Sequence, residues 1–175
     1  ELCDVADGER VLAGIGASLA LALGRNIEGL RAFPSYTGAG LDIPSTPAAL
    51  WIWARGEDRG ELFHRSRVIE RVLAPAFRLE QALDAFRHDR GRDLTGYEDG
   101  TENPKGGKAR LAAIVQEPSR LAGSSFAAIQ QWEHQFERFE AMTPRARDAT
   151  FGRRRSSNEE IAAAPASAHV KRTAQ

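Results

Sequence analysis

The residues best suited to do chemistry lie in a loop that runs from Gly91 to Pro104 (GRDLTGYEDGTENP). The glycines, proline, asparagine and aspartates of this run favour turns and positive φ, so it cannot form a helix or a central strand. A turn-rich loop of this length inside a compact chain is usually functional or disordered. Within it, Asp99 precedes Gly100. A carboxylate in such a loop can be held by backbone N–H groups while it faces a cavity, which suits a general acid or base.

The acidic loop also has two simpler interpretations. An aspartate in a turn most often bonds only its own backbone, and by itself Asp99 fits that pattern. Glu98 and Glu102 lie close by and raise the question of a calcium loop. Their spacing does not match the EF-hand pattern, so we give calcium little weight.

His169 is the second candidate, in the segment Ser167–Arg172 (SAHVKR). A neutral imidazole suits haem iron or zinc, although a lone histidine is more often a satisfied structural residue. We expect His64 and His88 to be exposed, and His134 to cap or pack at a strand end. No pair of histidines has metal-ligand spacing, which argues against a mononuclear zinc enzyme.

Gly14 and Gly16 form half of a dinucleotide-binding fingerprint between an expected strand and an expected helix. The third glycine is missing, and Leu19 stands in its place. A tight turn from strand to helix explains two glycines equally well. A nucleotide-binding oxidoreductase therefore remains an alternative function.

A basic cluster lies in the last quarter of the chain, at Arg145, Arg147 and Arg153–Arg155. One interpretation is a solvated face near Glu159 and Glu160. The other is contact with an anionic carboxylate or phosphate group, for which the arginine fork is well shaped.

Composition limits the class of protein. The chain has 175 residues, enough for one domain or two small ones, and 42% of them are apolar. Its 24 basic residues balance 24 acidic ones, so bulk charge gives no case for nucleic-acid or membrane partners. The single cysteine, Cys3, excludes an internal disulfide and fits a reducing compartment, and we expect a cytoplasmic location. The longest apolar run, Val11 to Leu23, is shorter than the roughly 20 residues that span a bilayer.

The expected order of strands and helices predicts an α+β protein in which helices pack on one side of the sheets. We expect a loop over residues 31–48, and Pro144 as the first residue of a short helix capped by Thr143. The predicted strands are 10–15, 48–54 and 124–132, and the predicted helical segments are 18–23, 61–73, 79–86 and 133–142.

Several segments together resemble the dye-decolorizing peroxidases, a family of haem enzymes, in their bacterial cytoplasmic subgroup. Thr95–Pro104 is similar to the Gly-x-x-Asp-Gly signature of the family, and Ala168–Thr173 is similar to its ligand segment. These two are the most specific matches, and 70 residues separate Asp99 from His169, as in the family. Further matching segments follow in family order: Arg10–Leu19, Gly29–Pro34, Gly123–Phe126, Trp132–His134, Gly152–Arg153 and Asn158–Glu160.

The resemblance implies an α+β fold of two ferredoxin-like halves, as in dimeric α/β-barrel proteins, each an antiparallel sheet with helices packed on it. Residues 1–90 would form part of the first half and 91–175 part of the second. It implies haem b in the second half, with His169 as the proximal iron ligand. Asp99 would relay a proton on the distal face. Around it, Gly100, Thr101 and Glu102 would line the haem edge, and Arg153 would contact a propionate.

The implied activity is a peroxidase that uses hydrogen peroxide to oxidise bulky organic donors, such as dyes and phenols, by one-electron steps. Homo-oligomers and a shell protein that packages the enzyme are implied partners. Trp51, Trp53, Tyr97 and Trp132 would either conduct electrons or serve as core aromatics.

One departure from the family concerns the ends of the chain. The family has a distal arginine downstream of the ligand histidine, and the sequence stops at Gln175 before that position. The first strand and helix of the family are also not found ahead of Glu1. We therefore expect a fragment with a weakened peroxidase activity. A non-catalytic ferredoxin-like module that assembles through open sheet edges is the third hypothesis.

Overall fold

The computed structural model describes residues 2–38 and 40–173, which form two compact units. The N-terminal unit comprises the residues up to Leu83 together with Phe126–Ala128. The C-terminal unit comprises Asp84–Ser125 and the residues from Ile129 onward. The functional division into residues 1–90 and 91–175 stays a prediction.

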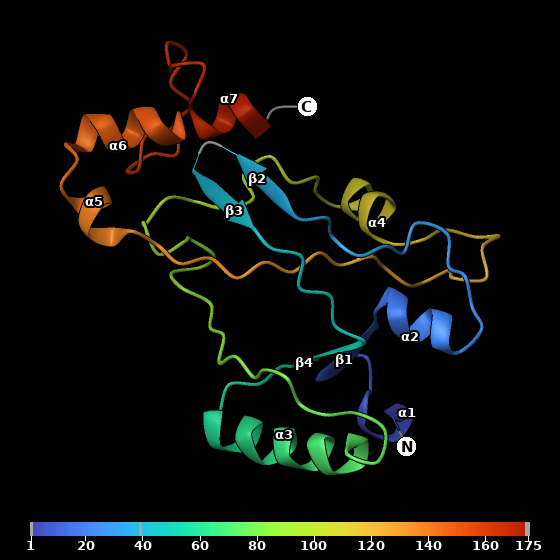
Figure 1. Ribbon diagram of the computed structural model, residues 1–175. Coiled ribbons are helices and arrows are strands. Elements are labelled where there is room, and N and C mark those ends of the chain that lie inside the picture. Colours follow the sequence, from blue (N-terminus) through green and yellow to red (C-terminus); the bar gives the residue numbers. More distant parts are fainter. Residues whose placement is uncertain (1, 39, 174–175) are drawn as a thin grey trace. The chain divides into compact units, whose positions relative to one another are not determined.

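The N-terminal unit contains a two-stranded antiparallel sheet (Figure 1). β1 (Val11–Ile15) pairs with β4 (Leu50–Ala54) in a register that sets Gly14 opposite Trp51. Both segments contain β-branched, aromatic or other large apolar residues that favour strands, and both predicted strands are confirmed. β4 is only partly buried, and its Trp53 is 46% exposed.

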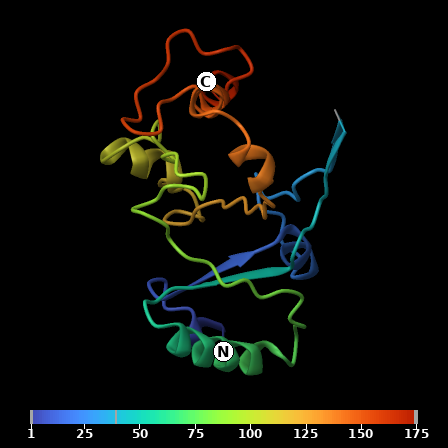
Figure 2. The same cartoon turned by 90° about the vertical axis from the view of Figure 1, so that its left-hand side faces the viewer.

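Helices precede, separate and follow the strands of this unit along the chain. The longest of the described helices, α3, is capped by Asp58, whose carboxylate accepts a hydrogen bond of 2.8 Å from the backbone N–H of Glu61. Its Ile69 is buried, and Pro75 follows the end of the helix. Figures 1 and 2 both show α1 beside α3. The helices of this unit are α1 (Leu2–Val5), α2 (Ala17–Ala22) and α3 (Arg59–Leu73), so the helices predicted at 18–23 and 61–73 are confirmed.

Close packing accounts for the two glycines at the end of β1 and the start of α2. A Cβ at Gly14 would lie 3.0 Å from the Cε3 atom of Trp51. A Cβ at Gly16 would overlap the backbone carbonyl oxygen of Ala48. Gly16 therefore requires glycine, and a side chain at Gly14 would press on the Trp51 ring, so the half-fingerprint needs no nucleotide to explain it.

The predicted loop at 31–48 contains a short antiparallel pair that the sequence did not indicate. β2 (Tyr36–Gly38) pairs with β3 (Leu41–Ile43), with Tyr36 opposite Ile43. Gly40 has φ of +77°, so one of the glycines that suggested a loop supplies the tight turn between two strands.

The C-terminal unit has short helices separated by long irregular segments. The best-defined helix is α6. Thr143 caps it by accepting a 3.2 Å hydrogen bond from the N–H of Ala146, Pro144 opens it, and Gly152 ends it in the left-handed region at φ of +80°. The predicted cap and proline are thus confirmed. The helices are α4 (Gly107–Ala113), α5 (Phe136–Glu140), α6 (Pro144–Phe151) and α7 (His169–Thr173).

Two predicted elements are wrong and a third is shorter than expected. Residues 79–86 form no helix, and residues 124–132 form no strand. Both segments leave their large apolar side chains exposed, with Phe86 at 75% and Trp132 at 60%. A periodic pattern becomes a stable element only where its apolar face is buried against a partner, and these exposed side chains are not buried in that way. The helix predicted at 133–142 covers only Phe136–Glu140.

The architecture is α+β, as predicted. Few side chains are fully packed, and the buried apolar residues among those described are Val11, Ala20, Ile69, Tyr97 and Ala168. None of the helices in the described ranges combines the length and the hydropathy needed to cross a membrane.

Candidate active site

The loop Gly91–Pro104 folds back on itself around one buried tyrosine. Tyr97 is 4% exposed and its ring stacks on Phe151 of α6, with centroids 3.9 Å apart. Its hydroxyl donates a 2.6 Å hydrogen bond to Oδ1 of Asp148, also on α6. Burial first, and then the bond to the Asp148 carboxylate, raise the pKa of Tyr97 well above its ordinary value. Tyr97 is therefore a core residue that ties the loop to α6.

Asp99 lies two residues beyond Tyr97 on the same loop, and its side chain is exposed. Gly100 follows with φ of +69°, and a Cβ there would lie 2.6 Å from Nδ2 of Asn103. This position therefore requires glycine for both its backbone conformation and its space. The carboxylate proposed from the sequence as an acid or base is thus accessible at a tight turn.

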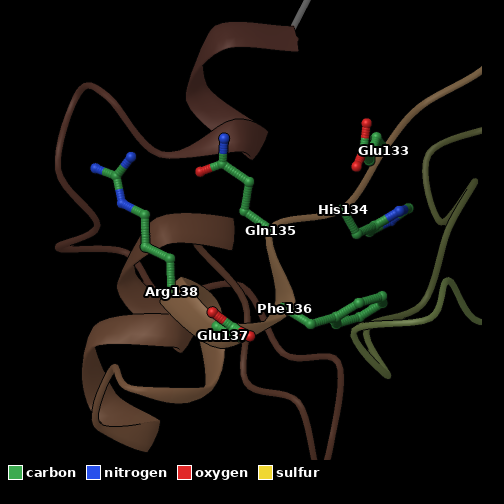
Figure 3. Close-up of a pocket in the computed structure, with 6 residues that line it drawn as sticks. All are labelled: Glu133, His134, Gln135, Phe136, Glu137 and Arg138. Atoms are coloured by element: carbon green, nitrogen blue, oxygen red, sulfur yellow. The ribbon is translucent and has the colours of Figure 1, made fainter.

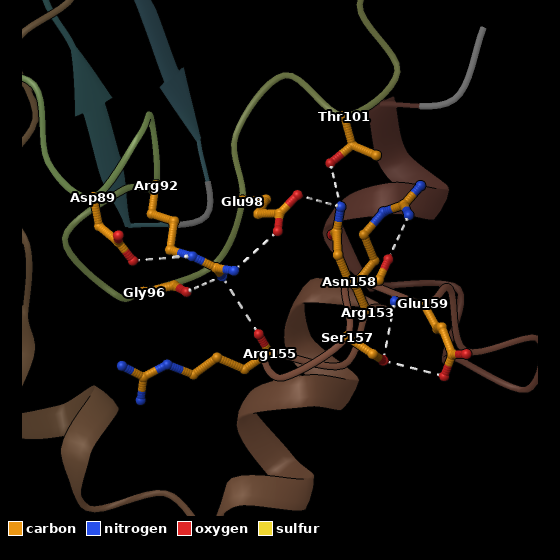
Figure 4. A network of polar contacts seen from close by, with 10 residues as sticks. All are labelled: Asp89, Arg92, Gly96, Glu98, Thr101, Arg153, Arg155, Ser157, Asn158 and Glu159. Carbon is orange, nitrogen blue, oxygen red and sulfur yellow. Dashed lines mark hydrogen bonds and ion pairs between the residues drawn. The ribbon is translucent and has the colours of Figure 1, made fainter.

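A hydrogen-bonded network joins this loop to residues 153–160 (Figure 4). Asn158 lies at its centre with φ of +59°. Its side-chain amide donates to Oε2 of Glu98 at 2.8 Å and to Oγ1 of Thr101 at 2.9 Å. On the other side of Glu98, Arg92 donates to Oε1 at 2.9 Å and to the carbonyl of Gly96 at 2.8 Å. Two segments about 60 positions apart in the sequence are held together in this way.

Arg153 of the basic cluster is largely enclosed, with a side chain 15% exposed. It pairs with the carboxylate of Glu102 and lies 3.9 Å from that of Glu160. It also donates a 2.9 Å hydrogen bond to the carbonyl of Asn158. Glu160 in turn accepts from Nζ of Lys171 at 2.6 Å, and this bond lowers the pKa of the Glu160 carboxyl. Carboxylates of the chain itself thus pair the charge of Arg153.

His169 is the first residue of α7, and its imidazole is exposed. The residue before it, Ala168, is completely buried. A Cβ at Gly152 would lie 3.2 Å from Cβ of Ala168 and would overlap a methyl group of Val170, so α7 packs closely on the end of α6. The ring of Phe151 lies 6.4 Å from that of His169. An accessible imidazole is therefore presented by a firmly packed helix start.

The structure brings Thr101, Glu102 and Arg153 into one network, and it sets Asp99 and His169 on segments that both contact α6. It does not show a direct contact between Asp99 and His169. Sequence reasoning gave no role to Asn158, Arg92 and Asp148, which hold the Asp99 loop against α6 and residues 153–160. A polar residue in the left-handed region leaves no signal in spacing or periodicity, so Asn158 could not have been found from the pattern.

The remaining histidines do not contribute to this site. His64 and His88 are exposed, as predicted. His134 stacks on Phe136 at 5.1 Å, beside an open hollow of about 630 Å³ (Figure 3). Six consecutive residues, Glu133–Arg138, line this hollow, and none of them is a predicted site residue.

The exposed side chains suit a haem iron, whereas the cation expected to meet a propionate is already paired within the chain. His169 presents an exposed imidazole, which is a suitable axial ligand. Asp99 presents an exposed carboxylate for proton transfer. Arg153, by contrast, is already engaged by Glu102 and Glu160.

Comparison with known proteins identifies relatives over most of the chain. The family model described as "Dyp-type peroxidase, C-terminal" matches residues 90–175. The dye-decolorizing peroxidase of Rhodococcus erythropolis is 30% identical over 176 residues, covering 96% of this chain and 51% of the relative. That of Mycobacterium tuberculosis is 30% identical over 144 residues, covering 81% and 43%. The chain thus spans about half the length of the curated relatives it matches.

Solved structures show the same fold. A dye-decolorizing protein from Vibrio cholerae superimposes with a TM-score of 0.79 at 23% identity, over 97% of this chain and 59% of that one. A variant of DypB from Rhodococcus jostii RHA1, in complex with heme, gives 0.77 at 22% identity, over 97% and 58%. Sequence and fold agree, and the chain belongs to the dye-decolorizing peroxidase family.

Proposed function

We propose that this chain carries the catalytic residues of a haem-dependent peroxidase, which uses hydrogen peroxide to oxidise bulky organic donors such as dyes and phenols by one-electron steps. One observation supports this most. Within the segment that the family model matches, the exposed Asp99 and the exposed His169 are carried by segments that both pack on α6. An acid/base group and an iron ligand on one support are the two groups that peroxide cleavage requires.

Haem b is the cofactor of this proposal, and the heme complex of the Rhodococcus jostii variant supports it. When bound, haem would supply the redox chemistry, while the protein provides orientation and electrostatics. His169 would hold the iron through one imidazole nitrogen. Gly100, Thr101 and Glu102 would line the edge of the ring, and Arg153 would meet a propionate after releasing a carboxylate of the chain.

Asp99 would perform the proton transfer. Cleavage of hydrogen peroxide needs a proton removed from one oxygen and delivered to the other, and one positioned carboxylate can do both. The exposed carboxylate of Asp99 can be reached by peroxide and offers an oxygen that can accept the first proton. The network of Asn158 and Glu98 fixes the loop on which Asp99 stands, which limits the search for the productive geometry.

A hemin titration followed by a turnover assay tests the proposal. We expect one-to-one binding with a Soret shift that His169→Ala abolishes and His64→Ala does not. Asp99→Asn should bind hemin normally but lower peroxide-dependent dye oxidation by about 10²-fold or more, with Asp42→Asn as the matched control. Unchanged ligation in His169→Ala would contradict the proposed iron ligand. Equal turnover in Asp99→Asn and wild type would contradict the proton-transfer role.

The remaining partners are part of the same proposal. We propose a cytoplasmic location, which the single cysteine supports. A homo-oligomer and a packaging shell protein are proposed from family membership alone. Analytical ultracentrifugation of the purified protein, with and without the candidate shell protein, would test both.

A further inference from the structure

Burial of the ring does not explain why residue 97 is a tyrosine. A phenylalanine would fill the same space against Phe151 and Phe139, whose rings lie 3.9 Å and 6.4 Å from that of Tyr97. The hydroxyl adds a 2.6 Å bond to Asp148, a charged acceptor. Hydrogen bonds to charged acceptors are about twice as strong as neutral ones and are directional. The hydroxyl therefore fixes the angle as well as the depth at which the loop meets α6.

Asp148 also holds a second segment. The same Oδ1 atom accepts a 3.1 Å hydrogen bond from the backbone N–H of Arg155. One carboxylate oxygen on α6 thus binds the loop 91–104 on one side and residues 153–160 on the other. The guanidinium of Arg155 lies against Gly96, where a Cβ would overlap it, so the two segments also touch each other.

The end of α6 supports the helix that begins with His169. Gly152 packs against Ala168 and Val170. Phe151 lies between two rings, with Tyr97 stacked at 3.9 Å and His169 tilted at 6.4 Å. Tyr97 is separated from Asp99 by one residue, Glu98, which the network around Asn158 restrains. A short physical path therefore runs from the Asp99 loop through Tyr97 and α6 to His169.

We propose that Tyr97 is a positioning residue whose hydroxyl, through Asp148, sets the Asp99 loop and the His169 helix on a common support. The proposal rests on the proposed function for the roles of Asp99 and His169. The mechanical link itself does not depend on those roles. Removal of the hydroxyl should loosen both segments together while the ring stack on Phe151 keeps the core filled.

Hydrogen exchange on the haem-free protein tests the link directly. The variant is Tyr97→Phe, and the matched control is Tyr36→Phe, which removes the hydroxyl of an exposed tyrosine. We expect amides of both 91–104 and 167–173 to exchange about tenfold faster in Tyr97→Phe, as the loss of about one net hydrogen bond predicts. Faster exchange in the loop alone, or equal exchange in both variants, would overturn the common support.

A double-mutant cycle guards against a purely local effect. Asp148→Ala removes the oxygen that accepts from the Tyr97 hydroxyl and from the Arg155 N–H. If the two groups act through their bond, Tyr97→Phe should add little to the exchange of Asp148→Ala. Fully additive effects would contradict the proposal. Circular dichroism would verify that each variant keeps its helices.

Enzyme kinetics test whether the coupling of the two segments through Tyr97 affects catalysis. In the haem-loaded protein, Tyr97→Phe should lower kcat for peroxide-dependent oxidation by about tenfold or more with little change in KM for the donor, since a misplacement of about 1 Å costs up to 10²-fold. Loosened segments with unchanged kcat would overturn the positioning role. If wild type binds no hemin, the proposed function fails, while the exchange experiment still decides whether Tyr97 couples the two segments.

Discussion

The two units of this chain differ in the contacts that stabilise each of them internally. The N-terminal unit relies on a backbone ladder between β1 and β4 and on a capped helix, α3. The C-terminal unit has no such ladder among its described residues beyond isolated bridges, and side chains join its irregular segments instead. The candidate catalytic residues all lie in the second unit. A backbone ladder tolerates substitution of surface side chains, whereas a network of side chains loses contacts with each member that is replaced. The candidate catalytic residues therefore lie in the unit that is more sensitive to substitution.

The largest expected effect comes from glycines at close contacts, which test the packing of each unit. Gly16→Ala should destabilise the N-terminal unit, and Gly152→Ala the C-terminal unit, each by about 3 kcal/mol, because the new Cβ meets atoms that cannot move freely. At Gly152 the left-handed φ adds to this cost. Urea unfolding gives the loss, and hydrogen exchange shows which unit opens.

The matched control is Gly107→Ala at the start of α4, where a Cβ meets nothing within 4 Å. It should leave the free energy of unfolding nearly unchanged. A loss equal to that of Gly152→Ala would show that close packing is not the cause.

Asn158 offers a sharper test of the side-chain network. Asn158→Ala removes the bonds to Glu98 and Thr101 and leaves a residue with Cβ in the left-handed region. We expect a loss of about 2 kcal/mol, against about 1 kcal/mol for Asn158→Gly, which restores the backbone freedom. Urea unfolding of the two variants separates the two contributions. Equal losses would mean that the backbone conformation costs nothing here.

Alkaline pH probes the same unit through Tyr97. The folded state raises the pKa of this phenol, so its contribution is complete below the unfolded pKa near 10.0 and is lost as pH rises above that value. Asp148 raises this pKa, while Arg155 and Arg147 oppose the shift. We expect the free energy of unfolding to fall above pH 10 by about 1 kcal/mol or more in wild type, and to fall less in Tyr97→Phe. Parallel curves would refute this assignment.

The smallest effect is expected in the N-terminal unit at acid pH. Asp7 accepts hydrogen bonds from the N–H groups of Glu9, Arg10 and Val11 just ahead of β1, and the bond from Val11 contributes most to lowering its pKa. A lowered pKa stabilises the fold above the ordinary value of 3.8, and this stability is lost as pH falls below it. Asp7→Asn should flatten that part of the stability curve slightly, as measured by urea unfolding. Asp42→Asn should leave it unchanged.

The sequence predicted the elements that local chemistry determines. The cap at Thr143, the helix that ends before Pro75 and the turn-rich loop around Asp99 each follow from residue types at fixed offsets. Predictions failed at 79–86 and 124–132, where the apolar pattern is present but the large side chains stay exposed. Whether such a segment folds depends on a partner surface, which no local pattern contains.

In the candidate site, too, the sequence identified some residues and could not identify others. The sequence singled out Asp99 and His169, but the groups that hold the Asp99 loop, Asp148 and Asn158, act across more than 50 positions. Single-sequence reasoning has no means of pairing residues at that separation. The resemblance to a family supplied the pairing of Asp99 with His169, and it supplied none of the supporting contacts.

The internal pairing of Arg153 affects how any external carboxylate can bind to it. Its guanidinium already shares its charge with Glu102 and lies near Glu160. An external carboxylate therefore enters by exchange, displacing an internal anion rather than neutralising a bare cation. The gain in such an exchange is the difference between two similar ion pairs, and the count of charges in contact does not change. Selection at Arg153 thus depends on fit, and added salt weakens the incoming and the departing partner alike.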